Sequence, residues 1–245
     1  SYTTVNTAAL SSALRNVAGC TNDDTNCREL RLLNINHDER AYAEAFVQKV
    51  FYDAYQARLD SFYPLLLSIS INTTPPPLNC GEYEYAAVAG IRPAGGEPLF
   101  LEQYLEQPVE QLLGIRRGHI IEIGNLAPAS VGQARWLITT LNAFMLGAGF
   151  THVVFTAVPR LKNAFSRMGL PLTRLAEADG SSLPPAEKAK WGNYYDAKPK
   201  VYVGDLRIGE GPLTAIAKTD RFLEDLCQRA TAAGEEFRSI LEQRH

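Results

Sequence analysis

The sequence predicts an α/β fold in which a mixed sheet is flanked by helices. Three observations support this prediction. Apolar runs of strand length alternate with longer amphipathic segments along most of the chain. Two early strand-like runs, 63–72 and 83–94, are expected to pair as an antiparallel hairpin with a long connection. A later strand–helix–strand unit, 119–158, has the order typical of two parallel strands joined by a crossover helix.

The bulk composition is that of a globular protein able to bury a sizeable core. The chain has 245 residues, of which 46% are hydrophobic and 21% are charged. A formal net charge of −3 gives no reason to expect a nucleic-acid partner. The sequence has no apolar run of membrane-spanning length, and its start lacks a basic segment followed by an apolar one. These features predict a cytoplasmic protein with no membrane span.

The four cysteines are not arranged as metal ligands. Cys20, Cys27, Cys80 and Cys227 form no CxxC pair, and no histidine lies at ligand spacing from them. We therefore expect no metal and predict reduced thiols, with a Cys20–Cys27 disulfide as a weakly supported alternative.

The first half of the chain is expected to begin with a polar arm over residues 1–30, which is rich in Ser, Thr, Asn and Asp. Tyr42, Phe46 and Val50 fall on one stripe at i, i+4 spacing, and this predicts a helix over 38–60. The two strands of the hairpin follow. The segment 99–115 is expected to form two short helical turns broken at Pro108.

The second half is dominated by the strand–helix–strand unit. Its expected elements are a strand over 119–126, a helix over 131–148 that stops at Gly149, and an apolar strand over 151–158. Further elements are expected at 160–169 (helix), 172–178 (strand), 200–208 (strand) and 217–244 (charged helix). The predicted organisation is the arm 1–30, one domain over 31–210, and a C-terminal helical extension over 211–245.

The start of the helix at 131 is a candidate site for an anion. A strand that passes through a glycine-containing loop into a helix presents free N–H groups and the positive end of the helix dipole. Small residues at Ser130, Gly132 and Ala134 would let a phosphate approach the backbone, and Arg135 adds a cation. A short connection also needs small residues for packing alone, so both readings stay open.

The order of elements, with "VGQARWL" after the fourth strand and "KNAFSRMGL" after the fifth, resembles the GNAT superfamily of acyltransferases. That resemblance implies a mostly antiparallel twisted sheet and a loop of pattern Q/R-x-x-G-x-G/A that holds the pyrophosphate of acyl-CoA. The matching window is 129–134, where Ala129 replaces the leading Gln or Arg and Arg135 is a candidate substitute. The residues that the resemblance assigns to the donor are Leu126, Ser130, Val131, Gly132, Gln133, Ala134, Arg135 and Asn163.

A more specific resemblance covers roughly residues 38 to 206. The pieces "ERAYAEAFVQKVFYDAY", "AAVAGIRPA", "LFLEQYLEQPVE", "IIEIGNLA", "LGAGF", "HVVFTAV" and "WGNYYDAKPKVYVGDL" resemble the thermostable hemolysin family. The same segments are more distantly similar to acyl-homoserine-lactone synthases, which take acyl chains from acyl carrier protein. This similarity implies catalytic roles for Glu122, Asn125 and Arg92, since "Glu122-Ile-Gly-Asn125" corresponds to the E-x-S-R motif of those synthases.

Glu122 is the expected general base. Acyl transfer to an amine requires a neutral nucleophile, and a partly buried carboxylate beside the thioester would accept the proton. By strand alternation Glu122 and Gly124 share one face, and Asn125 lies on the other. A bulge at Gly124–Asn125 would break that alternation and free N–H groups for the oxyanion. The alternative is a structural salt bridge from Glu122 to Arg92 or Arg116.

One departure from the GNAT pattern concerns the leaving thiolate. Phe165 occupies the position where many GNAT enzymes have the Tyr that protonates the leaving thiolate. Three alternatives stay open: the thiolate leaves unassisted, Tyr194 or Tyr195 replaces that Tyr, or the chemistry is not ordinary acetyl transfer. The aromatic segment 191–204 is expected either to wall an acceptor or acyl pocket or to pack as a loop.

Arg160, Lys162 and Arg167 form a basic cluster on the helix over 160–169. It would receive either an acyl carrier protein or a CoA phosphate, or form a solvated face.

These observations predict an N-acyltransferase with a GNAT-like fold. It would move an acyl group, expected to be fatty, from acyl-CoA or acyl carrier protein to a small amine such as an amino acid, in the biosynthesis of a signal or secondary metabolite. Two alternatives stay open: a haemolytic toxin, and a non-catalytic GNAT-like module that binds a thioester or a partner.

Overall fold

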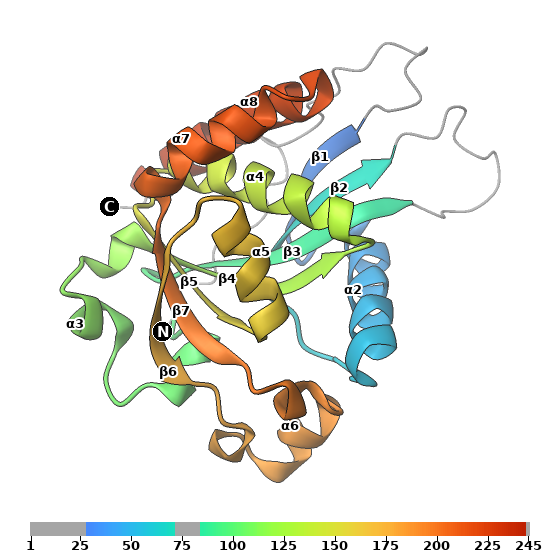
Figure 1. Cartoon of the computed structure of the whole chain (residues 1–245), viewed down its shortest axis with the longest axis vertical. Coiled ribbons are helices and arrows are strands. Elements are labelled where there is room, and N and C mark those ends of the chain that lie inside the picture. Colours follow the sequence, from blue (N-terminus) through green and yellow to red (C-terminus); the bar gives the residue numbers. More distant parts are fainter. Residues whose placement is uncertain (1–27, 72–83, 244–245) are drawn as a thin grey trace.

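A computed structural model describes residues 28–71 and 84–243. Seven strands form one sheet in the order β1-β2-β3-β4-β5-β7-β6 (Figure 1). The strands are β1 (Arg28–Leu33), β2 (Leu65–Ile71), β3 (Tyr85–Pro93), β4 (Ile120–Pro128), β5 (His152–Ala157), β6 (Leu172–Glu177) and β7 (Lys200–Asp205).

The α-helices are α2 (Arg40–Tyr55), α3 (Val109–Leu113), α4 (Val131–Gly147), α5 (Pro159–Arg167), α6 (Pro185–Lys190), α7 (Leu206–Ala217) and α8 (Arg221–Glu242). Short 3-10 helices are η1 (Phe100–Tyr104), η2 (Arg117–His119), η3 (Gly180–Ser182) and η4 (Tyr194–Ala197). No helix within the described residues is long and apolar enough to cross a membrane.

Every pair of neighbouring strands is antiparallel except β4 and β5, as the sequence predicts. The two parallel strands pair over only a short length, from Ile120↔His152 to Glu122↔Val154. Beyond Glu122 the register of β4 with β5 ends, and the two strands separate. This separation opens the middle of the sheet at the carboxyl ends of its parallel strands.

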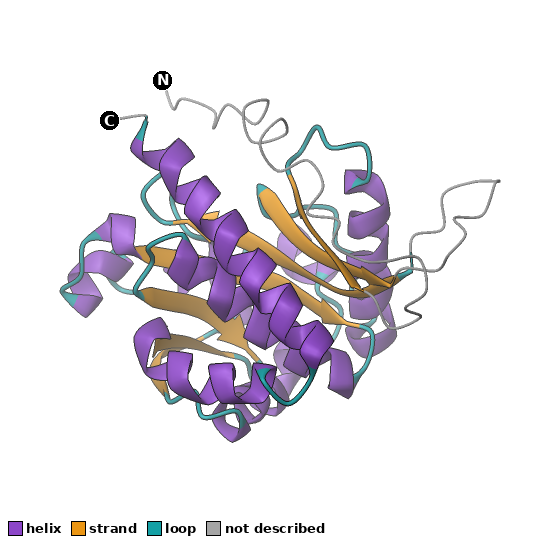
Figure 2. Cartoon of the chain, turned by 90° about the horizontal axis from the view of Figure 1, so that it is seen from above, coloured by secondary structure: helices purple, strands orange, loops and turns teal. Residues whose placement is uncertain are grey.

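The sheet is covered on both faces because successive apolar side chains of its strands point to opposite faces. Leu65 and Leu67 of β2 pack into a core with α4 and α8, whereas Leu66 packs on the opposite face against α2. Figure 2 shows α8 running across the outside of the α4 layer. The bulk of the hydrophobic core therefore lies between the sheet and the α4–α8 layer.

Several elements were not predicted from the sequence, among them β1, α6 and α7. β1 starts at Arg28, inside the range expected to be a polar arm, and the rest of that arm lies outside the described residues, together with Cys20, Cys27 and Cys80. α7 begins inside the strand expected over 200–208 and continues through residues 209–216, for which no element was predicted. Gly209 of this helix admits a close neighbour, since a Cβ there would lie 2.1 Å from Leu170 Cδ2. The expected boundary at 210/211 falls inside α7.

Candidate active site

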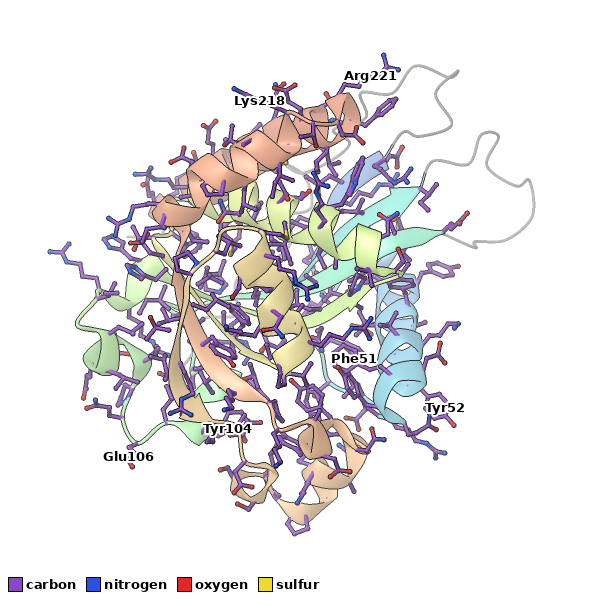
Figure 3. The ribbon with its side chains drawn as sticks, in the orientation of Figure 1. Phe51, Tyr52, Tyr104, Glu106, Lys218 and Arg221 are labelled. Atoms are coloured by element: carbon purple, nitrogen blue, oxygen red, sulfur yellow. The ribbon has the colours of Figure 1, made fainter. Side chains whose placement is uncertain are left out.

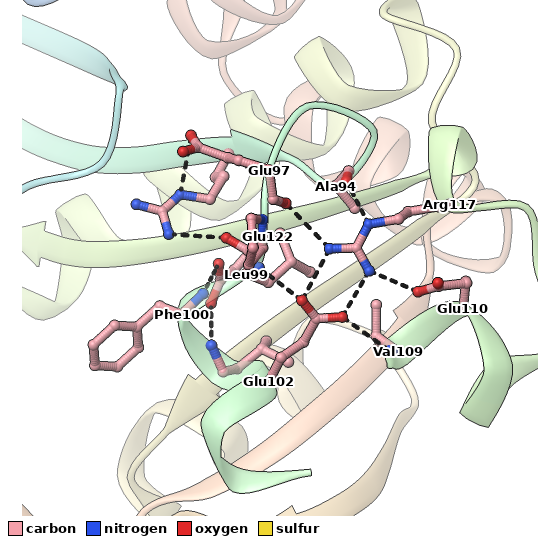
Figure 4. A network of polar contacts seen from close by, with 12 residues as sticks. Ala94, Glu97, Leu99, Phe100, Glu102, Val109, Glu110, Arg117 and Glu122 are labelled. Carbon is pink, nitrogen blue, oxygen red and sulfur yellow. Dashed lines mark hydrogen bonds and ion pairs between the residues drawn. The ribbon is translucent and has the colours of Figure 1, made fainter. Parts of the chain in front are cut away.

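Glu122 is buried near the start of β4, with 1% of its surface exposed. Its carboxylate accepts two backbone N–H bonds from the start of η1, from Phe100 N at 2.9 Å and from Leu101 N at 3.0 Å (Figure 4). The N-terminus of a helical turn suits a negative charge because its N–H groups have no partner within the helix. The alternative of a salt bridge with Arg116 is wrong, since Arg116 is exposed and these amides hold the carboxylate.

A second acid fixes the helical turn that holds Glu122. Glu102 accepts the N–H groups of Leu99 (2.8 Å) and Val109 (3.1 Å), so it ties η1 to the start of α3. Arg117 donates to Glu102 at 2.6 Å and also to Glu110 at 2.6 Å. The hydrogen bond from Arg117 lowers the pKa of Glu102 to about 2. Glu102 therefore stays ionised and keeps the amides of η1 directed at Glu122.

Burial raises the pKa of Glu122 to about 7, because the charged form loses its hydration in the interior. The nearby charge of Arg92, the Phe100 and Leu101 amides and the Tyr63 hydroxyl all oppose this rise. The outcome is a carboxyl group that is partly protonated and partly ionised at neutral pH, which suits a general base.

Arg92 faces Glu122 directly across β3 and β4, where the two residues are register partners. Its guanidinium stacks over the ring of Tyr63, 4.8 Å from the centroid, and lies 3.7 Å from the carboxylate of Glu97. The Arg92 Nε is buried without a hydrogen-bond partner among the described residues. This Nε faces Glu97, and Nη1 donates to the carbonyl of Pro98 at 3.5 Å. Arg92 therefore acts on Glu122 through its charge.

Asn125 forms the predicted bulge. Val88 faces Ala127 and Gly90 faces Gly124, so one β3 residue opposes both Asn125 and Leu126. Asn125 has a φ of 47°, in the left-handed region that Asn tolerates better than most residues. The bulge turns its side chain to the Glu122 face, where Asn125 Oδ1 accepts the N–H of Tyr63 at 3.2 Å. Strict alternation had placed Asn125 on the other face, and that prediction is wrong.

A cleft of about 860 Å³, including its open mouth, begins where β4 and β5 separate. Both strands contribute walls, β4 through residues 123–126 and β5 through Thr156. The remaining walls are mainly aromatic: Phe51, Tyr55, Phe62, Tyr63, Phe100, Tyr104, Trp191, Tyr194 and Tyr195. Figure 3 labels Phe51 and Tyr104, which come from α2 and η1.

The aromatic segment after α6 lines this cleft because it is tied to the end of α2. Asn193 N donates to Tyr55 O at 2.9 Å, and Gly192 has a φ of 54°. A Cβ at Gly192 would lie 2.2 Å from Tyr55 O, so the close approach requires glycine. The hydroxyl of Tyr195 lies 2.5 Å from that of Tyr104 across the cleft.

The residues assigned to the donor phosphates lie mostly around the start of α4. Ser130 caps the helix by accepting the N–H of Gln133 at 3.5 Å, and Val131 is 74% exposed. A Cβ at Gly132 would find Ser130 Oγ nearest, at 3.9 Å, so the backbone here is open to a ligand. Arg135 donates to Thr219 Oγ1 at 3.0 Å.

The other assigned residues have different surroundings. Leu126 lines the cleft, Ala134 lies in the first turn of α4, and Asn163 is exposed on α5. The donor assignments therefore stay predictions.

Phe165 belongs to the core and not to the cleft. It is 4% exposed and stacks on Phe155 with ring centroids 4.7 Å apart. Sequence reasoning missed Tyr63 and Arg40. Arg40 is buried and donates to Tyr63 O at 2.6 Å. Tyr63 is the first residue of the strand expected over 63–72 and lies next to Pro64, and that position alone gave no functional signal.

A mixed, mostly antiparallel sheet with one parallel β4–α4–β5 unit and flanking helices is the fold class expected from the GNAT resemblance. The chain belongs to the thermostable hemolysin family, whose profile matches residues 33–210. A comparison with curated proteins found no match.

Three solved structures share the fold at low sequence identity. TofI in an apo form is 12% identical with a TM-score of 0.53, covering 76% of this chain and 95% of TofI. FeeM, an N-acyl amino acid synthase from uncultured soil microbes, is 14% identical with a TM-score of 0.50, covering 79% and 98%. BjaI, a CoA-dependent acyl-homoserine lactone synthase, is 12% identical with a TM-score of 0.50, covering 84% and 99%.

Proposed function

We propose that this protein transfers an acyl group from a pantetheine thioester to a small amine. The observation that carries the proposal is the buried Glu122, with a pKa of about 7, beside an aromatic cleft in an opened sheet. The shared fold with an N-acyl amino acid synthase and with a CoA-dependent synthase supports the reaction class. The acceptor is an amine such as an amino acid, and the product is an acylated signal or secondary metabolite.

The opened sheet suits the donor. In the proposed complex the pantetheine arm enters between β4 and β5, and the thioester lies near the Asn125 bulge. Thr156 Oγ1 is buried in this region without a hydrogen-bond partner among the described residues, so it can bind a pantetheine amide. Backbone N–H groups of β4 past the bulge would stabilise the oxyanion of the tetrahedral intermediate.

The outer end of the donor would lie on the start of α4. There Ser130, Val131, Gly132, Gln133, Ala134 and Arg135 would hold the phosphates, with Leu126 and Asn163 beside the pantetheine. A carrier protein would dock on the α5 side, where Arg160 and Arg167 are exposed and Lys162 is half-buried. Acyl-CoA and acyl carrier protein would both present the acyl group as a thioester of phosphopantetheine.

The aromatic walls suit the acyl chain and the apolar part of the acceptor. Arg92 is the one charged side chain among the described residues that line the cleft, so it would orient the carboxylate of an amino acid. Tyr194 and Tyr195 both line the cleft, and either would supply the proton that Phe165 cannot give to the leaving thiolate.

A thiol-release assay tests the proposal. Purified protein is mixed with acyl-CoA and acyl-carrier donors of increasing chain length and with a panel of amino acids. We expect release with at least one pair, and a loss of about 10²-fold or more for Glu122→Gln. Binding without release in every mixture would favour a non-catalytic module. Leakage of liposomes by the protein alone, with no thioester present, would favour a toxin.

A further inference from the structure

We propose that Tyr63 is a catalytic residue that passes the proton of the acceptor amine from the cleft to Glu122. This inference rests on the proposed acyl transfer and names a group that contacts the reacting nitrogen. It arises because Glu122 is shielded from the cleft whereas Tyr63 contacts both.

Glu122 is poorly placed to meet a substrate directly. It is 1% exposed and is not among the residues that line the cleft, although Ile123 and Gly124 beside it are. Both of its oxygens accept backbone N–H groups from η1. A proton leaving an amine in the cleft must therefore pass through another group.

The hydroxyl of Tyr63 fills this gap. Its Oη lies over Gly124, on the face of β4 that also carries Glu122, where the phenol favours the charged carboxylate and so lowers its pKa. The Tyr63 side chain also lines the cleft. The ring lies against two glycines that are register partners, Gly90 and Gly124. A Cβ at Gly124 would lie 2.5 Å from Tyr63 Oη, and a Cβ at Gly90 would lie 2.7 Å from Tyr63 Cβ. The missing side chains create the space in which the phenol lies.

Separate contacts fix Tyr63 from other directions. Its N–H donates to Asn125 Oδ1, its carbonyl accepts from the buried Arg40, and the Arg92 guanidinium stacks on its ring. Asn125 and Arg92 therefore act on the reaction partly by placing this phenol. A side chain held on three sides keeps the geometry that proton transfer requires.

The charges around the pair favour transfer through a neutral phenol. Arg92 on β3 and the Tyr104 hydroxyl group on η1 also interact electrostatically with Glu122. Burial and the neighbouring carboxylate raise the pKa of Tyr63 well above its usual value, so the hydroxyl keeps a proton. It donates that proton to Glu122 while it accepts one from the amine.

The atoms balance as follows. The amine nitrogen forms a bond to the thioester carbonyl carbon, and the resulting ammonium proton moves to Tyr63 Oη as the phenol proton moves to Glu122. The carbon–sulfur bond then breaks, and sulfur leaves with the electron pair as a thiolate. When the products leave, Glu122 returns its proton to Tyr63 Oη as the phenol releases one to water in the cleft.

Kinetics of Tyr63→Phe test the relay. We expect kcat to fall by about 10²-fold, with a much smaller change in the KM of the thioester, because the phenyl ring preserves packing but carries no proton. Tyr52→Phe on the exposed side of α2 is the matched control and should leave kcat unchanged. A kcat of Tyr63→Phe equal to that of the parent, alongside an inactive Glu122→Gln, would overturn the relay and leave acyl transfer standing.

Gly124→Ala provides an independent test because its Cβ would lie 2.4 Å from Tyr63 Cζ. It should displace the phenol and reproduce the loss seen in Tyr63→Phe, and the double variant should be no worse than either single one. Gly211→Ala is the control, since a Cβ at that position of α7 meets nothing within 4 Å. Additive losses in the double variant would contradict the relay.

A titration that needs no turnover separates this inference from the proposed function. The Glu122 carboxyl is followed by ¹³C NMR of protein labelled at the Glu side chains, with Glu122→Gln identifying its signal. Removing the Tyr63 hydroxyl should raise the pH at which Glu122 titrates, because the hydroxyl stabilises the charged form. An unchanged midpoint would overturn the relay. An absence of thiol release with every substrate pair would instead overturn the acyl transfer.

Discussion

At the scale of single residues, Glu122 experiences opposing effects that together set its proton affinity. Burial disfavours the charge, while two amides, Arg92 and Tyr63 favour it. The net result is a pKa of about 7, raised from 4.5, so the group is a base that keeps about half its charge at neutral pH. An isolated buried carboxylate would be protonated, and a fully solvated one would be a weak base.

The raised pKa has a measurable effect on stability. Glu122 binds its proton more tightly in the folded protein than in the unfolded chain, so the free energy of unfolding falls as pH rises from 4.5 to about 7. The expected loss is roughly 3 kcal/mol. In Glu122→Gln this loss is absent, so the variant should gain about 2 to 3 kcal/mol relative to the parent between pH 5 and pH 8. Urea unfolding at both pH values checks this, and a constant difference would refute the raised pKa.

Activity should follow the same ionisation. With an acceptor amine that stays neutral between pH 5 and 9, kcat/KM should rise with pH as Glu122 becomes ionised, reach half its maximum near pH 7 and level off about one pH unit higher. The measurement is thiol release across this range. A profile that is flat between pH 5 and 8 would show that a different group accepts the proton.

At the scale of elements, the loop between β3 and β4 determines whether the site is assembled. Arg117 connects Glu102 and Glu110 and donates to the carbonyl of Ala94 at 2.6 Å. Glu102 in turn caps η1 and α3 (Figure 4). The positions of the Phe100 and Leu101 amides, which bind Glu122, therefore depend on the ion pairs of Arg117 with Glu102 and Glu110.

Arg117→Gln should therefore destabilise the protein by about 2 to 3 kcal/mol at neutral pH, since it leaves two partly buried carboxylates without their partner. The pKa of Glu102 is depressed to about 2, so this stabilisation is present above pH 4.5 and is lost as pH falls toward 2. The difference in the free energy of unfolding between the parent and Arg117→Gln should therefore disappear as the pH falls toward 2. Arg116→Gln, at the exposed neighbour, is the control, and an equal effect of both substitutions would contradict the network.

Sequence patterns predicted most of the elements because apolar periodicity and breakers are local signals. The two helical turns around Pro108 and the parallel β4–α4–β5 unit are both confirmed. The contacts of Glu122 were not predictable, because a carboxylate bound by backbone amides leaves no trace in residue identity. The proposed role of Tyr63 was not predicted for a related reason. It depends on Gly90 and Gly124, which come together only through the register of β3 and β4.

At the scale of the whole molecule, the C-terminal helices pack as part of the same core as the sheet. Phe237 of α8 is 1% exposed and stacks near Phe144 of α4, with ring centroids 5.7 Å apart. A Cβ at Gly234 would lie 2.2 Å from Phe144 O, so the two helices meet at a glycine. The segment 211–245 was predicted to be an extension, and these contacts give it a structural role that can be tested.

We expect truncation after Asp220 to abolish cooperative folding, because it uncovers α4. Phe237→Ala should cost about 3 to 5 kcal/mol, the usual range for a buried Phe. Ser239→Ala, on the exposed side of α8, should change stability by less than about 0.5 kcal/mol. Thermal unfolding followed by circular dichroism distinguishes these cases, and a truncated chain with the parent's melting temperature would establish an independent extension.

The central claim, that Glu122 drives acyl transfer to an amine, is tested most directly by mass spectrometry of small molecules in a host that expresses the protein. No prior choice of donor or acceptor is needed. The claim predicts an N-acylated amine that accumulates with the parent protein and is absent with Glu122→Gln expressed at the same level. Equal amounts of the same product with both proteins, or no new acylated amine with the parent, would contradict it.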